Sequence, residues 1–195
     1  MKILVACEYS GRVRDAFIAK GHDAMSCDLL PTDVPGPHYQ GDVFDIIRYG
    51  WDLMIAHPPC TYLTNSGVCH LHTDITRWPK LFDAGNFFKM LDNCCIPKIA
   101  IENPIPHKYA AALMGRKYDQ IIQPHMFGHM ETKATCLWLR NLPKLVATND
   151  VKTEMLLLPK NMRQRLHYLP PSKDRWKIRS ATFPGIANAM AEQWG

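Results

Sequence analysis

Two apolar runs in the sequence end in side chains that can carry out chemistry. The run over residues 51–57 leads into two prolines and then Cys60, within the stretch HPPCTYLTNSG. The run over residues 97–101 leads into Glu102 and Asn103, within IENP. A thiol becomes an effective nucleophile when its target receives a proton, and a carboxyl group drawn partly out of water keeps its proton to higher pH and can supply it. Cys60 and Glu102 together therefore indicate covalent catalysis on a heterocycle.

The two prolines bear on where the thiol lies. Proline cannot donate to a strand ladder, and two in succession stiffen the backbone. Cys60 is therefore predicted on a rigid turn just beyond the end of a buried strand. One helix separates this strand from the one that leads to Glu102, so the two strands are expected to be neighbours. The ordinary alternatives are a buried structural cysteine and a capping carboxylate.

A third group of residues indicates a cofactor that contains a nucleoside. In ACEYSGRVRDAF a strand gives way to a turn with Ser10 and Gly11 and then to a helix, so backbone can approach a ligand beside the helix N–H groups. Asp28 ends the next strand, where an acid can bind the hydroxyls of a ribose. Asp42 follows a Pro/Gly-rich loop, where it could accept from an adenine amino group. The alternative for each aspartate is a helix cap or a turn.

The elements that would position these side chains alternate along the chain. This alternation predicts an α/β fold with a mostly parallel sheet and helices on both faces. Ligands then bind beyond the carboxyl ends of the strands, which is where the polar residues above fall. Strands are predicted over residues 2–7, 22–30, 51–57, 97–103 and 134–139, and helices over residues 11–21, 43–50, 78–94, 107–115 and from about 184 onward.

The composition is that of a globular protein. The chain has 195 residues, 47% of them hydrophobic and 21% charged, which suits one domain over residues 1–195. No apolar run reaches the roughly 18 residues of a membrane helix, so no membrane association is expected. The seven cysteines lack regular spacing, so we expect no disulfide framework and a cytoplasmic location. Cys69, His70 and His72 lack the two spaced ligand pairs of structural zinc, and no metal is expected.

Positive charge gathers near the C-terminus. The net charge is +5, and residues 142–180 hold nine Lys or Arg against three acids. His167, Tyr168 and Trp176 are interleaved with them, and weak periodicity predicts a loop-rich basic insertion. Basic groups beside aromatic rings suit phosphates and stacked bases, so we expect a nucleic-acid partner, with a solvated face as the alternative. The expected contacts are Lys133, Arg163, Arg165, Arg175, Lys177 and Arg179.

Taken together, these motifs resemble those of one family. HPPCTYLTNSG resembles the Pro-Cys motif of the AdoMet-dependent DNA cytosine-C5 methyltransferases, and IENP is similar to their Glu-Asn-Val motif. ACEYSG, Asp28 and GDVFDI resemble, in order, the three cofactor motifs of that family. The resemblance covers most of residues 1–140 and is greatest to short methylase-like proteins of phages and prophages. It implies a Rossmann-like, doubly wound sheet of the class I methyltransferase type, the cofactor S-adenosyl-L-methionine (AdoMet) and a DNA substrate.

The resemblance also implies roles for particular residues. Cys60 would attack C6 of a cytosine, Glu102 would bond N3 and the exocyclic amino group, and Asn103 would fix the Pro-Cys turn. C5 would then take the methyl group, and elimination of the thiol would restore aromaticity. Lys133 would contact the base or a phosphate, and the target base would leave the DNA stack. The implied cofactor-binding residues are Cys7, Glu8, Ser10, Gly11, Asp28, Leu29, Asp42, Val43, Pro58 and Asn188.

The chain departs from the family pattern in three places. Glu131, Lys133 and Thr135 stand where the family has a Gln-x-Arg-x-Arg motif, and threonine cannot replace a guanidinium. Asn188 is the nearest match to the Gly-Asn-Ala-Val-Pro motif, and residues 142–180 stand in place of a long target-recognition region. Two alternatives stay open. One is a non-catalytic nucleic-acid-binding protein, and the other is an amino methyltransferase for adenine N6 or cytosine N4, whose Pro-Pro motif begins and ends differently.

Overall fold

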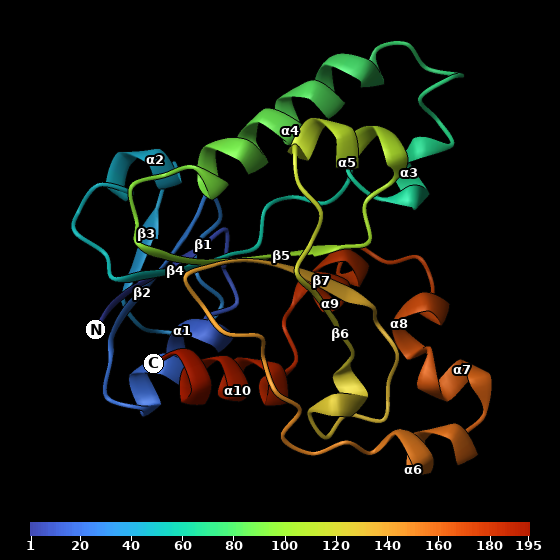
Figure 1. The fold of residues 1–195 in the computed structure, drawn as a ribbon. Coiled ribbons are helices and arrows are strands. Elements are labelled where there is room, and N and C mark those ends of the chain that lie inside the picture. The colour runs from blue at the N-terminus through green and yellow to red at the C-terminus, as the bar shows by residue number, and fades with distance from the viewer.

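A seven-stranded sheet runs through the middle of the computed structural model, which describes residues 1–195 (Figure 1). Its strand order is β3-β2-β1-β4-β5-β7-β6. The first five strands in this order are parallel, whereas β7 is antiparallel to both β5 and β6. The predicted mostly parallel, doubly wound sheet is confirmed. The strands are β1 (Lys2–Ala6), β2 (Asp23–Asp28), β3 (His38–Gln40), β4 (Leu53–Ala56), β5 (Lys98–Pro104), β6 (Gln120–Ile122) and β7 (Thr135–Arg140).

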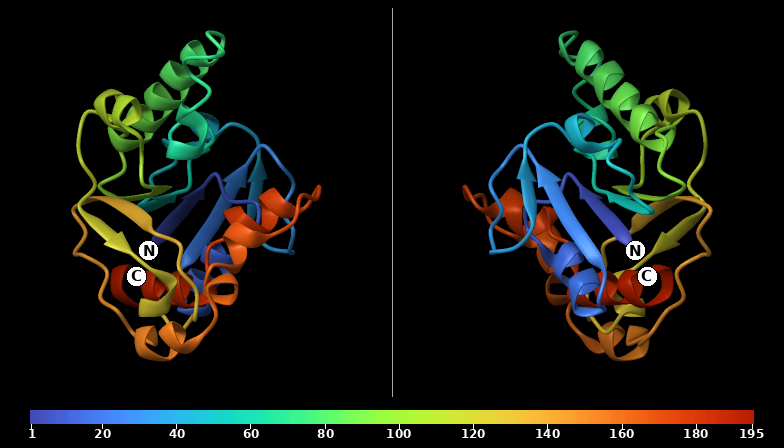
Figure 2. Two further views of the ribbon diagram at one scale, coloured as in Figure 1. Left: turned by 90° about the vertical axis from the view of Figure 1, so that its right-hand side faces the viewer. Right: turned by 90° about the vertical axis from the view of Figure 1, so that its left-hand side faces the viewer.

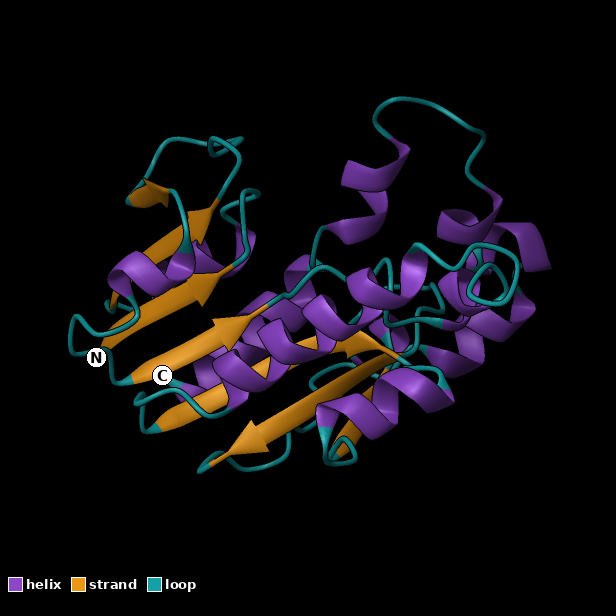
Figure 3. Cartoon of the chain, turned by 90° about the horizontal axis from the view of Figure 1, so that it is seen from above, coloured by secondary structure: helices purple, strands orange, loops and turns teal.

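Helices cover both faces of the sheet, as predicted (Figure 1 and Figure 3). On one face lie α1 (Arg12–Ala19) and α10 (Pro184–Trp194). On the other lie α2 (Val43–Ile46), α4 (Arg77–Asp92) and α5 (Lys108–Met114), and the short α3 (Asn65–Val68) follows β4.

Alternation along the strands divides the core into two layers. Ile3 and Val5 of β1 pack in the layer beneath α1 and α10, and Leu4 packs in the layer beneath α4. Each layer contains 21 buried residues, so neither face of the central strands is left to solvent. This explains why the strands read as continuous apolar runs that end abruptly in polar residues.

Residues 142–180 form four short helices where the sequence predicts a loop-rich insertion. They are too short, at four to six residues each, to show a helical period. Leu145 and Leu166 join the core layer beneath α10, so the segment packs against the main body (Figure 2). The helices are α6 (Lys152–Leu157), α7 (Lys160–Arg163), α8 (Arg165–Tyr168) and α9 (Arg175–Ser180).

Three strands differ from prediction. β3 lies in the expected loop over residues 31–42 and pairs parallel with β2. β6 has only three residues, which is too few for a period. β7 was expected in a parallel arrangement but runs antiparallel to β6, because only the 3₁₀ turn η1 (Pro124–Met126) separates them and no helix crosses over. None of the helices combines the length and apolarity that crossing a bilayer requires.

Candidate active site

His57 and Glu102 are adjacent because His57 directly follows β4 and Glu102 lies within the neighbouring strand β5. β4 and β5 are parallel neighbours with Ala56 opposite Ile101, so the next residue of each segment emerges at the same edge. Nδ1 of His57 lies 3.3 Å from Oε2 of Glu102, and the side chains are 14% and 11% exposed. From the sequence, His57 is expected at the same strand end as Cys60, and a hydrogen-bonded structural role is favoured over a role in the site. The ion pair with Glu102 is what the sequence could not show.

Cys60 and Glu102 line one cavity of about 150 Å³, named here the Cys60 cavity. Asn103 and Lys133 line it too, so the structure gathers all four residues that the sequence analysis assigned to catalysis. Arg179 and the residues that follow α9 form another part of the wall. Cys60 itself is only partly buried, so its sulfur is not sealed inside the protein.

The surroundings of the Cys60 thiol keep it protonated. Burial raises its pKa above the ordinary 9.0, and the positive charges of Lys133 and Arg179 oppose this shift without cancelling it. The sulfur is therefore a weak nucleophile in the free protein. Attack on a ring requires an acid that withdraws electrons from the ring as the bond forms.

The pKa of the Glu102 carboxyl group is lowered, whereas the sequence predicted a raised one. Burial disfavours its charged form, but the hydrogen bond and charge of His57, with the charge of Lys133, outweigh burial and hold the pKa of Glu102 below its ordinary 4.5. Burial also disfavours the imidazolium, yet the contact with Glu102 raises the pKa of His57 above 6.5. Between about pH 4.5 and 6.5 the pair is thus a carboxylate and an imidazolium, and the acidic proton lies on His57.

Asn103 connects the two motifs. Its side chain is buried, and Nδ2 donates to the carbonyl oxygen of Pro58 at 3.1 Å. This is the contact expected of a residue that fixes the Pro-Cys turn. Oδ1 of Asn103 is buried without a hydrogen-bond partner, so the amide still has an acceptor to offer.

A second cavity of about 230 Å³, named here the donor cavity, contains both predicted aspartates. Oδ1 of Asp28 accepts from the backbone of Leu30 at 2.9 Å, and Oδ1 of Asp42 caps α2 through Phe44 at 3.0 Å. Each carboxylate keeps a second oxygen for a ligand, so the turn role and the ligand role are compatible. Apolar walls beside two acids suit a nucleoside. The other lining residues are Cys7, Cys27, Leu29, Gly41, Val43, Pro59 and Phe87.

Cys7 and Pro59 belong to the walls of both cavities. Cys7 has φ of 58°, in the left-handed region that non-glycine residues rarely adopt. Such strain costs on the order of 1–3 kcal/mol and gathers at functional sites. Because the two cavities share these walls, one end of a molecule bound in the donor cavity would reach the Cys60 cavity past Cys7 and Pro59.

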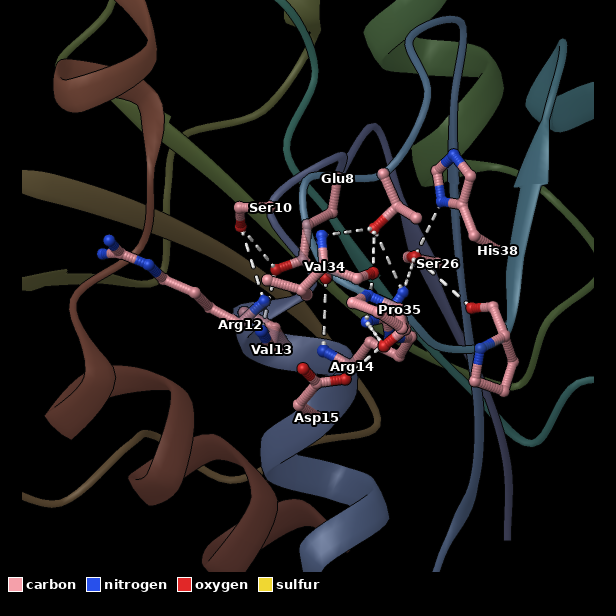
Figure 4. A network of polar contacts seen from close by, with 12 residues as sticks. Glu8, Ser10, Arg12, Val13, Arg14, Asp15, Ser26, Val34, Pro35 and His38 are labelled. Carbon is pink, nitrogen blue, oxygen red and sulfur yellow. Dashed lines mark hydrogen bonds and ion pairs between the residues drawn. The ribbon is translucent and has the colours of Figure 1, made fainter.

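Glu8, one of the predicted cofactor residues, lines the Cys60 cavity and also caps the start of α1 (Figure 4). Its Oε1 accepts from the backbone N–H of Val13 at 2.7 Å and from the Ser10 hydroxyl at 3.1 Å. Its Oε2 accepts from the backbone N–H of Arg14 at 3.2 Å. The N–H groups expected to face a ligand are thus bound by the protein's own anion, which the helix dipole favours.

Arg14 is fully buried and orders the loop between β2 and β3. Its Nε donates to Oδ1 of Asp15 at 2.7 Å, and its Nη1 donates to the Ser26 hydroxyl at 3.2 Å. Its Nη2 donates to the carbonyl oxygens of Val34 and Pro35 at 3.3 and 3.2 Å (Figure 4). Gly11 has φ of 71°, and a Cβ there would lie 2.5 Å from Nη2 of Arg14. Gly11 is therefore needed for the turn, and it lines neither the donor cavity nor the Cys60 cavity.

The remaining predicted cofactor residues divide three ways. Leu29 and Val43 line the donor cavity. Pro58 lines the Cys60 cavity, as does Ser10. Asn188 lines neither, because α10 begins at Pro184 and Asn188 falls on the exposed side of that helix.

Two of the predicted nucleic-acid residues lie at the Cys60 cavity. Nζ of Lys133 donates to the carbonyl oxygen of Arg179 at 2.9 Å, and both residues line the cavity. Arg175 donates from Nη2 to His167 at 3.4 Å, while its Nε is buried without a partner. The guanidinium of Arg163 makes no ion pair.

Arg165 and Lys177 are instead paired within the protein. Arg165 contacts Glu131 at 2.8 Å, and Lys177 contacts Asp33 at 3.0 Å. All four residues line a third cavity of about 580 Å³ that adjoins the turn after β1. Of the six predicted cations, two thus line the Cys60 cavity and two are held in ion pairs within the protein. No three His, Cys, Asp or Glu side chains cluster closely enough to hold a metal ion.

The sheet order and the two adjoining cavities define a Rossmann-like α/β protein with a site at the carboxyl ends of its strands. No family model and no curated protein matches the sequence. Among solved structures, the Entamoeba histolytica methyltransferase EhMeth matches with a TM-score of 0.50 at 14% identity, over 89% of this chain and 64% of that one. At this identity the likeness establishes the fold alone, a Rossmann-like α/β sheet with helices on both faces.

A second solved structure is similar over much of the chain. It is a protein assigned as a DNA modification methyltransferase, encoded within a prophage (E. coli), with a TM-score of 0.49 at 16% identity, over 82% of this chain. The present chain spans 56% of that protein's length and 64% of the length of EhMeth. It therefore corresponds to part of each.

Proposed function

We propose that the chain is an AdoMet-dependent methyltransferase that acts on C5 of cytosine in DNA through a covalent bond between Cys60 and C6. One observation carries the proposal: Cys60 and Glu102 share a cavity whose wall, at Cys7 and Pro59, is also the wall of the donor cavity. A nucleophile, an ionisable group and a donor pocket thus converge on one point, which is the arrangement that covalent activation of a ring requires.

Each residue has a task that follows from its position. Cys60 forms the bond to C6, and the turn that carries it is held by Asn103. Glu102 faces the ring nitrogen and the amino group, where one carboxyl can bind both. Lys133 and Arg179 surround the thiol with positive charge, which favours the sulfur as it loses its proton. The thiol leaves again once a base has removed the proton from C5.

The donor cavity fits AdoMet in its nucleoside part. Asp28 would bind the ribose hydroxyls and Asp42 the adenine amino group, with Leu29 and Phe87 against the flat ring. AdoMet, when bound, supplies an electrophilic methyl group. The residues of this chain would hold its sulfur end near Cys7, toward the Cys60 cavity.

The Cys60 cavity fits a DNA base that has left the duplex better than a base that is still stacked within it. A base inside a duplex cannot reach a thiol within a cavity of about 150 Å³, so the target must leave the stack. Arg179 and Lys133 lie at this cavity, where they can hold the phosphates that flank an extruded nucleotide.

The test is nucleoside mass spectrometry of DNA incubated with the protein and AdoMet that carries a labelled methyl group. The proposal predicts labelled 5-methylcytosine, none of it with Cys60→Ser, and a covalent complex with DNA that contains 5-fluorocytosine. Cys69→Ser, which alters an exposed cysteine outside the cavity, is the matched control. Label on N4 or N6 that survives Cys60→Ser would indicate an amino methyltransferase. DNA binding with no label would indicate a non-catalytic binding protein.

A further inference from the structure

The contact between His57 and Glu102 has a use beyond holding the carboxylate in place. Both side chains line the Cys60 cavity, and Nδ1 and Oε2 are 3.3 Å apart. Nε2 of His57 is buried and has no hydrogen-bond partner. The imidazolium is therefore bound through one nitrogen only, and nothing else in the protein anchors its second N–H.

The proposed chemistry needs a proton that Glu102 does not carry. A neutral thiol adds to C6 only if N3 is protonated as the π electrons of the ring move toward it. The sequence analysis assigned that proton to Glu102, but in the free protein the carboxyl group is ionised. The proton closest to it is the one on Nδ1 of His57.

We infer that His57 stores the proton that Glu102 passes to the target ring, so that the two side chains act as one acid. This rests on the proposed function. When the ring enters, the N–H bond at Nδ1 breaks and an O–H bond forms at Glu102, which then protonates N3 as the S–C6 bond forms. The neutral imidazole left behind keeps its Nε2–H, and its free Nδ1 accepts the proton that leaves the Cys60 thiol. The pair thereby regains its proton, and the net charge of the cavity is unchanged.

Other charged groups around the pair favour this arrangement. Glu8, in the turn after β1, stabilises the imidazolium, and Lys133, before β7, opposes it. Asp28, at the end of β2, also lies within electrostatic range of His57. Arg179, in α9, lowers the pKa of Cys60. The carboxylates of Glu8 and Asp28 together favour the proton on His57 more than the cation of Lys133 disfavours it. The proton therefore stays on His57 until the ring of the target base replaces water in the cavity.

Two measurements separate proton storage from simple positioning. The first is an NMR titration of the His57 imidazole nitrogens in the free protein, with and without Glu102→Gln. Storage predicts a pKa above 6.5 that falls in the variant. An unshifted His57 in the wild-type protein would overturn the inference. This readout does not depend on methyl transfer, so it stands even if the proposed function fails.

The second measurement is the pH profile of transfer and of 5-fluorocytosine adduct formation in His57→Gln, which keeps an N–H donor for Glu102 but carries no titratable proton. We expect kcat to fall by about 100-fold or more, with KM for DNA little changed and the alkaline limb of the profile lost. His125→Gln is the matched control, because His125 is another buried histidine with a carboxylate partner, Asp150 at 2.9 Å, outside the cavity. Wild-type kcat across the profile in His57→Gln would reject storage while leaving the methyltransferase proposal intact.

Discussion

The amide nitrogen of Asn103 donates to the carbonyl oxygen of Pro58 across 3.1 Å, and so joins two segments that lie 45 positions apart in the sequence. The bond is buried at the junction of β5 with the turn that carries Cys60. A proline carbonyl at this place has no strand partner, because the ladder between β4 and β5 ends at Ala56. The Asn103 side chain thus continues the sheet beyond its last backbone pair and sets where the sulfur lies.

Loss of this bond is expected to affect activity more than folding. Asn103→Ala should lower the free energy of unfolding by about 1–3 kcal/mol, because a buried carbonyl loses its partner. It should lower kcat by roughly 10²-fold, because the sulfur is no longer held against the ring. Urea unfolding and labelled-methyl transfer measure the two effects. Asn93→Ala, which removes an exposed side-chain bond to Lys89, is the control and should leave kcat unchanged.

The thiol of Cys60 should react slowly with alkylating agents at neutral pH. Burial raises the pKa of Cys60 above 9.0, so its iodoacetamide labelling should rise only above about pH 9. Cys69 should label faster because it is exposed to the reagent. Lys133→Gln removes a charge that lowers the pKa of Cys60, and should shift its labelling profile further toward alkaline pH. Peptide mass spectrometry after timed labelling gives both profiles. Rapid labelling of Cys60 at pH 7 would contradict the described surroundings.

Glu8 is expected to matter for stability through α1. Glu8→Ala leaves the first N–H groups of the helix without an acceptor and should lower the free energy of unfolding by about 1–2 kcal/mol. Glu8→Gln keeps one acceptor oxygen and should lose less. Urea denaturation of the three proteins gives the ranking. Equal stability of the alanine variant and the wild-type protein would show that the cap is dispensable.

Sequence patterns predicted the strand ends, and therefore the meeting of Cys60 with Glu102, because apolar runs of parallel strands stop where the sheet stops. They also brought Asp28 and Asp42 together, and these two residues line one cavity in the structure. They could not predict that Glu8 would turn back onto its own helix, since a carboxylate beside a turn suits a ligand or a cap equally well. That choice depends on side-chain direction.

The prediction that Glu102 holds its proton was wrong for a related reason. A carboxyl group after a buried strand is expected to hold its proton, unless a cation lies beside it. That cation is His57, and its position follows only from the register of β4 against β5. The expectation that Asn188 faces the cofactor did not hold, for a different reason. A short motif match cannot tell which side of a helix faces the cleft, and α10 turns Asn188 to solvent.

The ion pair between His57 and Glu102 should give the protein a stability optimum in mildly acidic solution. The lowered pKa of Glu102 contributes stability that is complete above its ordinary 4.5 and is lost as pH falls through the folded-state value. The raised pKa of His57 contributes stability that is complete below its ordinary 6.5 and is lost as pH rises through the folded-state value. Both contributions are therefore full between about pH 4.5 and 6.5.

Glu102→Gln should lower the free energy of unfolding most in this window, by about 1–3 kcal/mol, and less on either side. Urea unfolding from pH 4 to 9 tests this, with Glu192→Gln, whose carboxylate is exposed, as the control. A difference between Glu102→Gln and the wild-type protein that does not vary with pH would mean that the two groups are not charged together.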